Sequence, residues 1–409
     1  GTDLFGPNPA GGPKDQTAPI GRPRIPRDKA NDYAESAAKA RRDFIRDQTG
    51  VELKHTGRYS FDATETQGNC EHFTGVAQVP LGIAGPVLVN GEHAQGEFYV
   101  PMATAEGTLV ASYNRGMRLT REAGGITVTV ADDAMQRAPV FAFDNARTAK
   151  QFGAWIIDNM ATIRATAEAT TSIGKLRNVE HYAAARFLYL RFNFTTGDAA
   201  GQNMCGKATH AACQWILANS PFAVERFSLS GNMDTDKKPS QINFLHSRGK
   251  RVIAECTIPD QLMRDVMGID CKSLYRRRIM SMTGAFMAGS MNNGAHAANG
   301  ITATFIATGQ DAANVAESCV GAAVGELTDD GSYYFSITLP SLICASYGGG
   351  TGLPSQRECL EMMDCYGQGK ARKLAEIIGA TVLAGEMSLA AAVATGDWVT
   401  SHEQYGRNR

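Results

Sequence analysis

With 409 residues, the chain is too long to build around one hydrophobic core, so we expect two or three domains. Its formal net charge is -1, and this near-neutral balance excludes a broad basic surface of the kind that binds nucleic acid or an anionic membrane. Nine cysteines, an odd number without Cys-x-x-Cys spacing, argue against a disulfide framework and a structural zinc site. We therefore expect small-molecule chemistry or self-association in a reducing, cytoplasmic setting, with no metal.

Residues 1–69 are predicted to form a small N-terminal extension. Residues 1–26 contain six prolines and too few large apolar groups to pack, which indicates an extended arm. The alanine-rich, charge-alternating run at 28–49 is typical of a helix, with Asp28 as its N-cap and Gly50 at its C-terminal end.

Residues 139–229 have the pattern of a compact unit inserted in a larger domain. The expected elements are a strand at 140–143, a helix at 147–170, a weak strand, a strand at 186–194, a helix at 201–219 and a strand at 223–229. This order, β-α-β-β-α-β, is that of the ferredoxin-like fold. We expect an α+β protein in which this unit interrupts a large, mainly helical domain made of residues 70–138 and 230–409.

Two apolar stretches of the large domain are predicted to be buried helices rather than membrane spans. Residues 279–310 contain no Asp, Glu, Lys or Arg, but polar residues such as Asn292 interrupt them, which predicts a helix pair or a kinked helix. In the long helix expected at 370–395, Glu376 and Glu386 argue against a span.

The loop at residues 228–243 is the first candidate for a catalytic element. It places Lys237 and Lys238 side by side behind Asp236, and Pro239 disfavours a helix there. A lysine fixed on a loop beside an acid can stabilise an oxyanion during carbonyl reduction or acyl transfer. The alternative is a solvated surface turn.

Glu106 has two interpretations. The segment 101–107 leads into an expected helix with Thr104 as its N-cap, which places Glu106 in the first turn, where an acid complements the helix dipole. If Glu106 is buried instead, desolvation raises its pKa and makes it a proton donor.

A third feature, the run from Gly201 to Lys207, fits the P-loop pattern G-x-x-x-x-G-K. Ala208 stands where a hydroxyl would bind magnesium, and no apolar strand ending in a metal-binding Asp follows, so an NTPase is the weaker interpretation. The start of the helix remains a candidate contact for a phosphate or pyrophosphate.

Seven long motifs, in order along the chain from about residue 70 to the C-terminus, closely resemble the 3-hydroxy-3-methylglutaryl-coenzyme A reductase family. They are VPLGIAGPVLVNG (79–91), VPMATAEGTLVASYNRGMR (100–118), TGDAAGQNM (196–204), SGNMDTDKKPSQIN (230–243), AHAANGITATFIATGQDAAN (295–314), GGGT (348–351) and LAGEMSLAAAVATG (383–396), followed by Ser401-His402. They resemble the class found in eukaryotes and archaea more than the divergent bacterial class.

This resemblance implies a four-electron reductive deacylation of 3-hydroxy-3-methylglutaryl-coenzyme A to mevalonate and free coenzyme A, using two NADPH. The catalytic residues that it implies are Glu106, Lys237, Asp311 and His402. Lys237 would stabilise the oxyanion, and Glu106 would manage the proton. Asp311 would couple the pKa values of these two groups, and His402 would protonate the coenzyme A thiolate.

The resemblance also implies two sets of binding residues. Those expected to contact the acyl substrate or its surroundings are Arg137, Ser230, Asp236, Lys238, His296, Asn299, Ser112, Asn114 and Arg115. Those expected to contact the nicotinamide cofactor are Asp198, Gly201, Asn203, Ser172, Lys175, Gly349, Gly350 and Thr351. The inserted unit would be the cofactor domain, without a Rossmann fingerprint. Because the family's site is shared between subunits, a homodimer or homotetramer is implied.

The sequence departs from the family pattern at two positions that bear on specificity. Met280 occupies a position where the family usually has a lysine that holds the acyl portion, and arginines at 276–278 are candidate substitutes. Ser172 stands where an arginine usually meets the cofactor's 2′-phosphate, although Lys175 and Arg177 are close in sequence. NADPH is expected over NADH. Three alternatives stay open: a reductase of another acyl thioester, a binding protein that lost the reaction, and the NTPase.

Overall fold

The computed structural model describes residues 23–396, and these form two compact units. The first unit runs to Pro80 and includes Gly352–Pro354, and the second contains Leu81–Thr351 and continues from Ser355. Each unit is described separately, and the second contains the candidate site.

The first unit contains one helix, α1 (Glu35–Thr49), and a short 3-10 helix, η1 (Ala63–Thr66). Gly50 ends α1 in the left-handed conformation, with φ 74°, so the predicted C-terminal end is confirmed. The predicted start is wrong, because the carboxylate of Asp28 accepts the N–H of Ala30 and caps a turn that precedes the helix.

Arg41 of α1 holds this small unit together. Its guanidinium is almost fully buried, and it donates to the carbonyl oxygens of Pro26, Asp32 and Phe73. A buried cation is costly unless its donors are used and its charge is paired, and the Asp32 carboxylate supplies that pair. The guanidinium therefore ties the segment before α1 to the chain that follows it.

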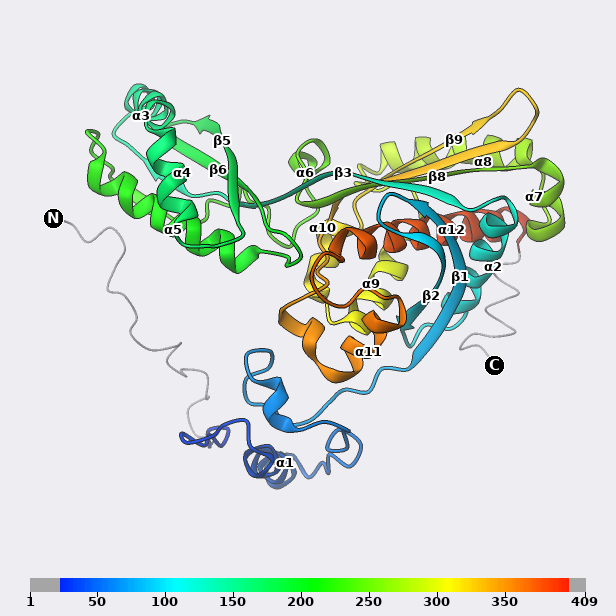
Figure 1. Ribbon diagram of the computed structural model, residues 1–409, viewed down its shortest axis with the longest axis horizontal. Coiled ribbons are helices and arrows are strands. Elements are labelled where there is room, and N and C mark those ends of the chain that lie inside the picture. The colour runs from blue at the N-terminus through cyan, green and yellow to red at the C-terminus, as the bar shows by residue number, and fades with distance from the viewer. Residues whose placement is uncertain (1–22, 397–409) are drawn as a thin grey trace. The chain divides into compact units, whose positions relative to one another are not determined.

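The second unit is a mixture of strands and helices around one large core (Figure 1). Its larger sheet has the strand order β2-β1-β3-β8-β10-β9, in which β1 and β3 are parallel and the other neighbours are antiparallel. The strands are β1 (Leu81–Gly91), β2 (Gln95–Ala103), β3 (Ile126–Arg137), β8 (Gly249–Ile258), β9 (Ala322–Leu327) and β10 (Tyr333–Leu342). The helices are α2 (Leu109–Glu122), α6 (Gln241–Leu245), α7 (Asp260–Met267), α8 (Cys271–Met287), α9 (Ala297–Thr308), α10 (Val315–Ser318), α11 (Pro354–Met362) and α12 (Ala371–Thr395), with 3-10 helices η2 (Ala312–Asn314) and η3 (Gly349–Gly352).

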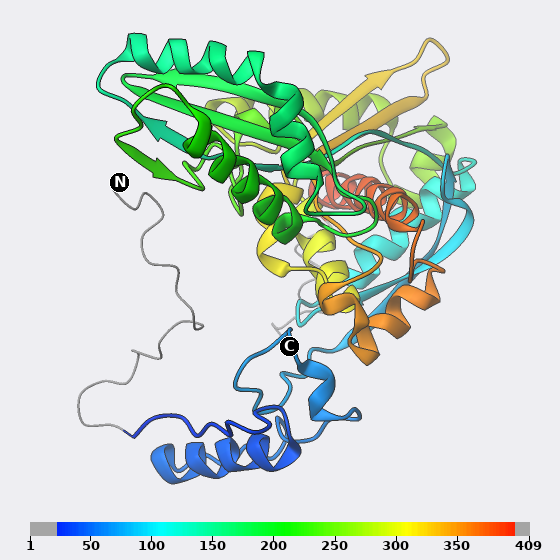
Figure 2. The same ribbon diagram turned by 60° about the vertical axis from the view of Figure 1, so that its left-hand side comes forward.

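Helix α12 is the central helix of this core. It lies between the sheet and helices α2 and α9 in both ribbon views (Figures 1 and 2), and every residue from 374 to 388 is buried. It is also the one described helix long and apolar enough to cross a membrane, but 78% of its most apolar window is buried inside the protein. The expected helix at 370–395 is therefore confirmed as a core helix. Two helices, α8 and α9, occupy the region expected at 279–310, and α9 is buried as predicted, but the predicted burial of α8 is wrong, because most of its residues from 279 onward are exposed.

Residues 139–229 form a second sheet with the strand order β7-β4-β6-β5. Its elements are β4 (Val140–Ala142), α3 (Ala146–Asp158), α4 (Met160–Glu168), β5 (Lys175–Ala184), β6 (Phe187–Thr195), α5 (Gln202–Asn219) and β7 (Arg226–Ser228). The order along the chain agrees with the sequence prediction, except that Asn159 divides the first helix into α3 and α4. Buried phenylalanines, among them Phe141, Phe152 and Phe192, fill its own core.

Strand β3 belongs to both sheets. Residues 127–134 pair with β8, and Met135–Arg137 pair with β6. Because one continuous strand joins the two sheets, Arg137 at its end lies where they meet.

The prediction that the larger part is mainly helical is wrong, because it carries the six-stranded sheet described above. Strand β3 was not predicted from the sequence, because Asp132 and Asp133 interrupt its apolar run. These two carboxylates pair with Arg177 and Lys250 in the fold. Strand β1 is continuous but has a register shift against β2 between Ala84 and Val87.

Close contact between α2 and α12 depends on two glycines. A Cβ atom at Gly116 would lie 1.8 Å from the carbonyl oxygen of Ala384, and one at Gly385 would lie 2.4 Å from the ring of Tyr113. Neither neighbour can move away easily, because both are buried in the core. The two helices can therefore approach this closely only with glycine at these positions.

We expect Gly116→Ala to lower the free energy of unfolding by about 1–3 kcal/mol, because the added methyl group must displace the backbone of α12. Gly284→Ala is the matched control, since Gly284 is also helical and a Cβ there meets no atom within 4 Å. It should be neutral or stabilising by up to about 1 kcal/mol. Chemical denaturation of both variants measures the difference, and equal stabilities would contradict the packing argument.

Candidate active site

The lysine loop, residues 230–240, connects β7 to α6 and is held in an unusual backbone conformation. Asn232, Thr235 and Lys237 have φ values of 66°, 55° and 55°. Left-handed conformations of non-glycine residues cost of order 1–3 kcal/mol each, and they persist only where surrounding contacts impose them. The expectation of a loop is confirmed, and its contacts exclude a freely solvated turn.

Lys237 and Asp311 form an ion pair at this loop. The Nζ atom of Lys237 lies 2.9 Å from Oδ2 of Asp311, and both side chains are partly exposed, at 44% and 47%. The hydrogen bond to Asp311 is the main cause that raises the pKa of Lys237; desolvation opposes it, and the charges of Asp311, Asp236 and Glu317 raise the pKa further. Lys237 is therefore an ammonium group with one face open to a ligand.

Asp311 is positioned by the end of helix α9. Gly309 ends that helix in the left-handed conformation, and Oδ1 of Asp311 caps the following 3-10 helix by accepting the N–H of Ala313. A Cβ atom on Gly309 would lie 2.2 Å from the carbonyl oxygen of Gly350, so the glycine-rich turn at 348–351 packs against this helix end. The turn expected to contact the cofactor is thus adjacent to the Lys237–Asp311 pair.

Glu106 lies on the turn between β2 and α2 rather than in a helix. Helix α2 begins at Leu109, and the hydroxyl of Thr104 accepts the N–H of Glu106 in the preceding turn, so the predicted first-turn position is wrong. The carboxylate is exposed and has no hydrogen-bond or ion-pair partner within residues 23–396. Its predicted role with Lys237 remains a prediction, and His402 lies outside the described residues.

The lysine loop brings together four residues expected near the acyl group, and their contacts hold the loop itself. Nη1 of Arg137 lies 3.0 Å from Oδ2 of Asp234, and the Ser230 hydroxyl donates to the same carboxylate. Asp236 pairs with Arg248, and Nζ of Lys238 donates to the Asp236 carbonyl oxygen at 3.0 Å.

Ser112, His296 and Asn299 form a second polar cluster, between α2 and α9. The His296 ring is buried, with Nε2 3.1 Å from the Ser112 hydroxyl and Nδ1 3.1 Å from the Asn299 amide nitrogen. Burial lowers the pKa of His296 to about 4, so the ring is neutral at pH 7. Since the amide of Asn299 can only donate to Nδ1, the proton lies on Nε2 and points to Ser112.

Two further residues expected in the substrate site make structural contacts. Asn114 accepts the N–H of Gly85 at 2.7 Å, which fixes β1 against α2. Arg115 donates to the Ser388 hydroxyl and carbonyl oxygens on α12.

The residues expected to contact the cofactor lie at the N-terminus of α5 and around it. Gly201 is the left-handed N-cap of this 18-residue helix, and Asn203 is exposed in its first turn. Free N–H groups at such a helix start favour a pyrophosphate, so the local structure fits a dinucleotide. The carboxylate of Asp198, however, accepts the N–H groups of Gly369 and Ala371, which caps α12.

The other expected cofactor contacts are more exposed. Ser172 lies on the surface, and Nζ of Lys175 lies 3.3 Å from Glu168. A Cβ atom on Gly349 would meet no atom within 4 Å, so this part of the glycine turn is open to a ligand, whereas Thr351 is buried.

The P-loop interpretation is wrong. Helix α5 begins at Gln202, so the residues between Gly201 and Gly206 are helical and cannot form a loop that surrounds phosphates.

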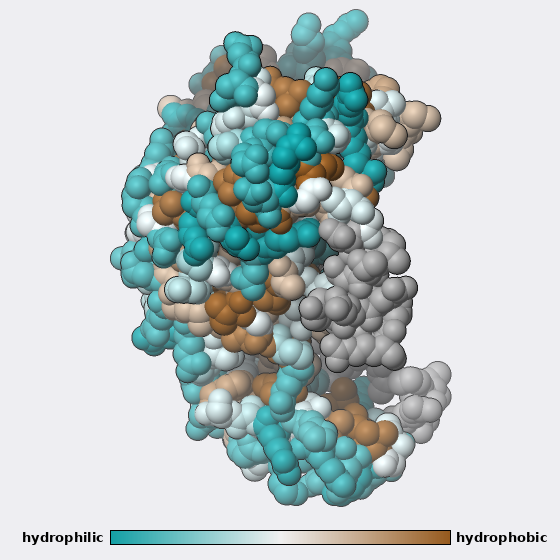
Figure 3. Space-filling view, turned by 90° about the vertical axis from the view of Figure 1, so that its right-hand side faces the viewer, coloured by the Kyte–Doolittle hydropathy of each residue, from teal (hydrophilic) through white to brown (hydrophobic). Residues whose placement is uncertain are grey.

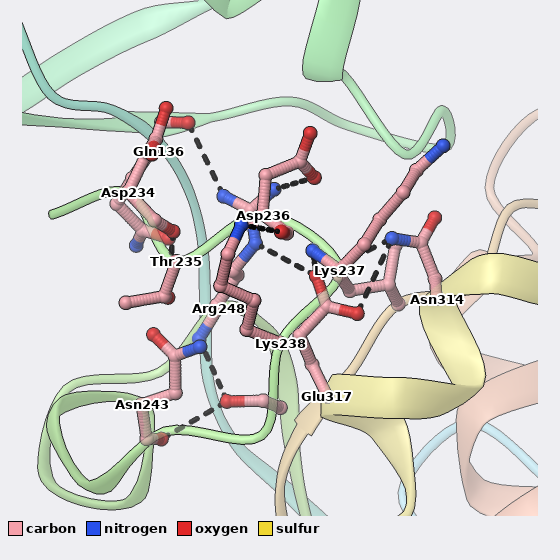
Figure 4. Close-up of polar contacts among 12 residues, drawn as sticks. Gln136, Asp234, Thr235, Asp236, Lys237, Lys238, Asn243, Arg248, Asn314 and Glu317 are labelled. Carbon is pink, nitrogen blue, oxygen red and sulfur yellow. Dashed lines mark hydrogen bonds and ion pairs between the residues drawn. The ribbon is translucent and has the colours of Figure 1, made fainter. Parts of the chain in front are cut away.

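Sequence analysis missed the buried residues that support the lysine loop. Arg248 and Glu317 are both fully buried and paired, at 3.2 Å from Nε to Oε1, and Asp234 is 1% exposed (Figure 4). The sequence feature that pointed toward such residues was the high charge density of the loop. Charged side chains that become buried when a loop packs need hydrogen-bonding partners.

Met280 lines a cavity of about 350 Å³ beside α12. Most of its lining side chains are apolar, such as Leu274, Tyr333 and Val393. Arg277 and Arg278 also line it. The two terminal nitrogens of Arg278 donate to backbone carbonyl oxygens of Asn293 and Ala323, whereas Arg277 is exposed and stays a candidate substitute for the lysine. Arg278 is therefore committed to the fold and is a poor substitute for a substrate-binding lysine.

A partly exposed ammonium–carboxylate pair near the start of a helix is an arrangement that can polarise a carbonyl group, as in enzymes that reduce or transfer acyl groups. The comparisons identify the family. A model described as hydroxymethylglutaryl-coenzyme A reductase matches residues 37–407. The chain belongs to the hydroxymethylglutaryl-coenzyme A reductase family.

Two archaeal relatives are similar along almost the whole chain. The 3-hydroxy-3-methylglutaryl-coenzyme A reductase of Methanocaldococcus jannaschii is 43% identical over 377 residues, which cover 91% of this chain and 93% of that protein. The enzyme of Pyrococcus horikoshii is 43% identical over 379 residues, with 91% and 92% covered. A class II reductase from Streptococcus pneumoniae, solved bound to NADPH in open conformations, has the same fold, with a TM-score of 0.67, 22% identity, and 87% of this chain and 86% of that chain covered.

His296 should make the protein sensitive to acid. Its pKa is about 4 when folded and 6.5 for the unperturbed group, so the unfolded chain binds more protons between these values. The contribution is fully present above pH 6.5 and is lost as the pH falls toward 4, up to about 3 kcal/mol. We expect the free energy of unfolding of His296→Gln to fall less than that of the wild type over this interval, and parallel curves would contradict the assignment.

Proposed function

We propose that this chain reduces 3-hydroxy-3-methylglutaryl-coenzyme A to mevalonate and free coenzyme A, with two NADPH consumed per product. The observation that carries the proposal is the 2.9 Å pair between Lys237 and Asp311 on a strained loop next to the glycine turn. Family membership supplies the reaction class, and the NADPH-bound bacterial relative supports the choice of cofactor.

NADPH, when bound, supplies the two hydrides that reduce the carbonyl carbon. The Lys237 ammonium stabilises the oxyanion that forms from the thioester carbonyl, and Asp311 keeps that ammonium charged. This oxyanion, the deprotonated hemithioacetal, then re-forms the carbonyl as its carbon–sulfur bond breaks, which leaves an aldehyde and the coenzyme A thiolate. His402 is proposed to protonate this thiolate, and Glu106 to deliver the proton to the alcohol oxygen in the second reduction.

The inserted sheet unit, residues 139–229, is proposed to bind the cofactor. The supporting features are the exposed start of α5 and the open glycine turn at 348–351. Lys175 and Arg177 are the proposed partners of a 2′-phosphate, although each already pairs with an acid, Glu168 and Asp132.

A reductase of a different acyl thioester on the same fold is the second candidate. Met280 lines a mainly apolar cavity, and a thioether cannot pair with a carboxylate. This feature favours an acyl group without a terminal acid.

A homodimer or homotetramer with shared sites is also proposed. Helix α8 exposes Ile279, Met280, Phe286 and Met287, the last two at 87% and 81%. Apolar patches are visible among polar side chains on the face in Figure 3. Surfaces of this kind are typical of protein contacts. The nine cysteines are all free, in agreement with the cytoplasmic setting proposed here.

The test of function is a reduction assay with purified protein. With 3-hydroxy-3-methylglutaryl-coenzyme A we expect two NADPH oxidised per mevalonate, faster than NADH, and Lys237→Ala should lower kcat by about 10²- to 10³-fold because an oxyanion donor is lost. Lys150→Ala, at an exposed lysine of α3, is the control. Turnover of only an uncharged acyl thioester would favour the second candidate, and full activity of Lys237→Ala would overturn both.

Asp311→Asn should move the basic limb of the pH profile of kcat/KM. Asp311 raises the pKa of Lys237, so without this carboxylate the ammonium loses its proton at lower pH. We expect activity to decline at a lower pH in the variant than in the wild type. A basic limb that stays in place would show that Lys237 is not the group titrating there.

A further inference from the structure

The backbone of Lys237 is bound by a buried carboxylate on a different element. The N–H of Lys237 donates to Oε1 of Glu317, in helix α10, at 2.7 Å, and Glu317 is fully buried. The Lys237 side chain extends away from this contact, while its amide faces Glu317 (Figure 4). Glu317 therefore fixes the backbone from which the Lys237 side chain extends, without touching the reacting atoms.

Arg248 holds Glu317 in place and reaches the residue before Lys237. Its Nε atom lies 3.2 Å from Oε1 of Glu317, and its Nη2 atom lies 2.6 Å from Oδ1 of Asp236. A further donor, Nη1, is bound by the carbonyl oxygen of Gln136 on β3 at 3.2 Å. Arg248 thus connects β3 to the loop at two neighbouring residues: directly at Asp236, and through Glu317 at Lys237.

Asn314 extends the network to the other half of the site. Its amide donates to Glu317 at 3.3 Å, its N–H donates to the carbonyl oxygen of Asp311 at 3.0 Å, and its side-chain oxygen accepts from Gln202 at 3.2 Å. The backbone of Lys237 therefore binds Glu317 directly, and the backbone of Asp311 is linked to Glu317 through Asn314. Gln202 is the first residue of α5, the helix proposed to meet the cofactor.

We propose that Glu317 and Arg248 are positioning residues that set the Lys237 ammonium against Asp311 for the reaction. The inference rests on the proposed function, since it assigns a role to Lys237 in turnover. Glu317 acts by holding the left-handed backbone of Lys237, at φ 55°, which the loop does not otherwise favour. The three groups around its carboxylate, from Lys237, Arg248 and Asn314, are all donors, so an acid fits there better than an amide.

The experiment compares the wild type with Glu317→Gln. The amide retains one acceptor but places an NH₂ group among donors, so the loop loses its fixed position. We expect kcat to fall about 10- to 100-fold with little change in KM for the thioester, because misplacement of a catalytic group acts on the transition state. The primary isotope effect with 4-deuterated NADPH should rise, and amide hydrogen exchange in the 230–243 peptide should become faster.

Glu317→Asp is the second variant, since it keeps the negative charge that Arg248 needs for folding. Its carboxylate is one methylene shorter and cannot reach both Arg248 and the Lys237 amide. The same changes in kcat and exchange are expected in this variant, at a smaller cost in stability.

Glu376→Gln is the matched control. Glu376 is also a fully buried glutamate whose carboxylate accepts backbone N–H groups, those of residues 92–94 in the β1–β2 turn. It should lower stability while leaving kcat per folded enzyme and exchange at 230–243 unchanged.

Wild-type kcat, isotope effect and exchange in either folded Glu317 variant would overturn the proposal, as would an equal loss of kcat in Glu376→Gln. Failure of the proposed function gives a different result. In that case the wild type reduces no acyl thioester, and hydrogen exchange at 230–243 alone decides whether Glu317 holds the loop.

Discussion

The buried pair of Arg248 and Glu317 is the interaction on which the lysine loop depends. Removing two charges from water is expensive, and in a protein interior the mutual attraction of a pair often only offsets that cost. The charged groups of the pair make four further contacts here, to Lys237, Asp236, Gln136 and Asn314. A hydrogen bond to a charged group contributes about 1.5–3 kcal/mol, which is comparable with the cost of the left-handed residues in the loop.

The same network explains why residues separated by more than a hundred positions meet at one place. Strand β3 brings Arg137 to the junction of the two sheets, where it binds Asp234 of the lysine loop. Helix α9 ends at Gly309, whose missing side chain lets the turn at 348–351 pack against it. Strand β3 and helix α9 therefore both end close to the lysine loop or its partner Asp311, through contacts between residues far apart in sequence.

Much of the fold was readable from the sequence where local patterns were decisive. The element order of 139–229, the helix end at Gly50 and the helix at 370–395 followed from turn residues and periodicity. The start of α1, the register shift in β1 and the existence of β3 did not follow from local patterns, because contacts with residues distant in sequence determine them. In the site, the motifs pointed to Lys237 and Asp311, and the structure joins them at 2.9 Å. Glu317 and Arg248 could not be found this way, because nothing in the local sequence shows that these two residues become buried and paired when the chain folds.

The exposure of the Lys237–Asp311 pair implies that the site works only when it is covered. At 44% and 47% exposure the two side chains remain close to water, where two charges 4 Å apart interact by only about 1 kcal/mol, against about 4 kcal/mol near a less polar protein surface. An ammonium group stabilises an oxyanion strongly only where water is excluded, because water screens the attraction between the two charges. A bound substrate and cofactor are the groups that would exclude that water.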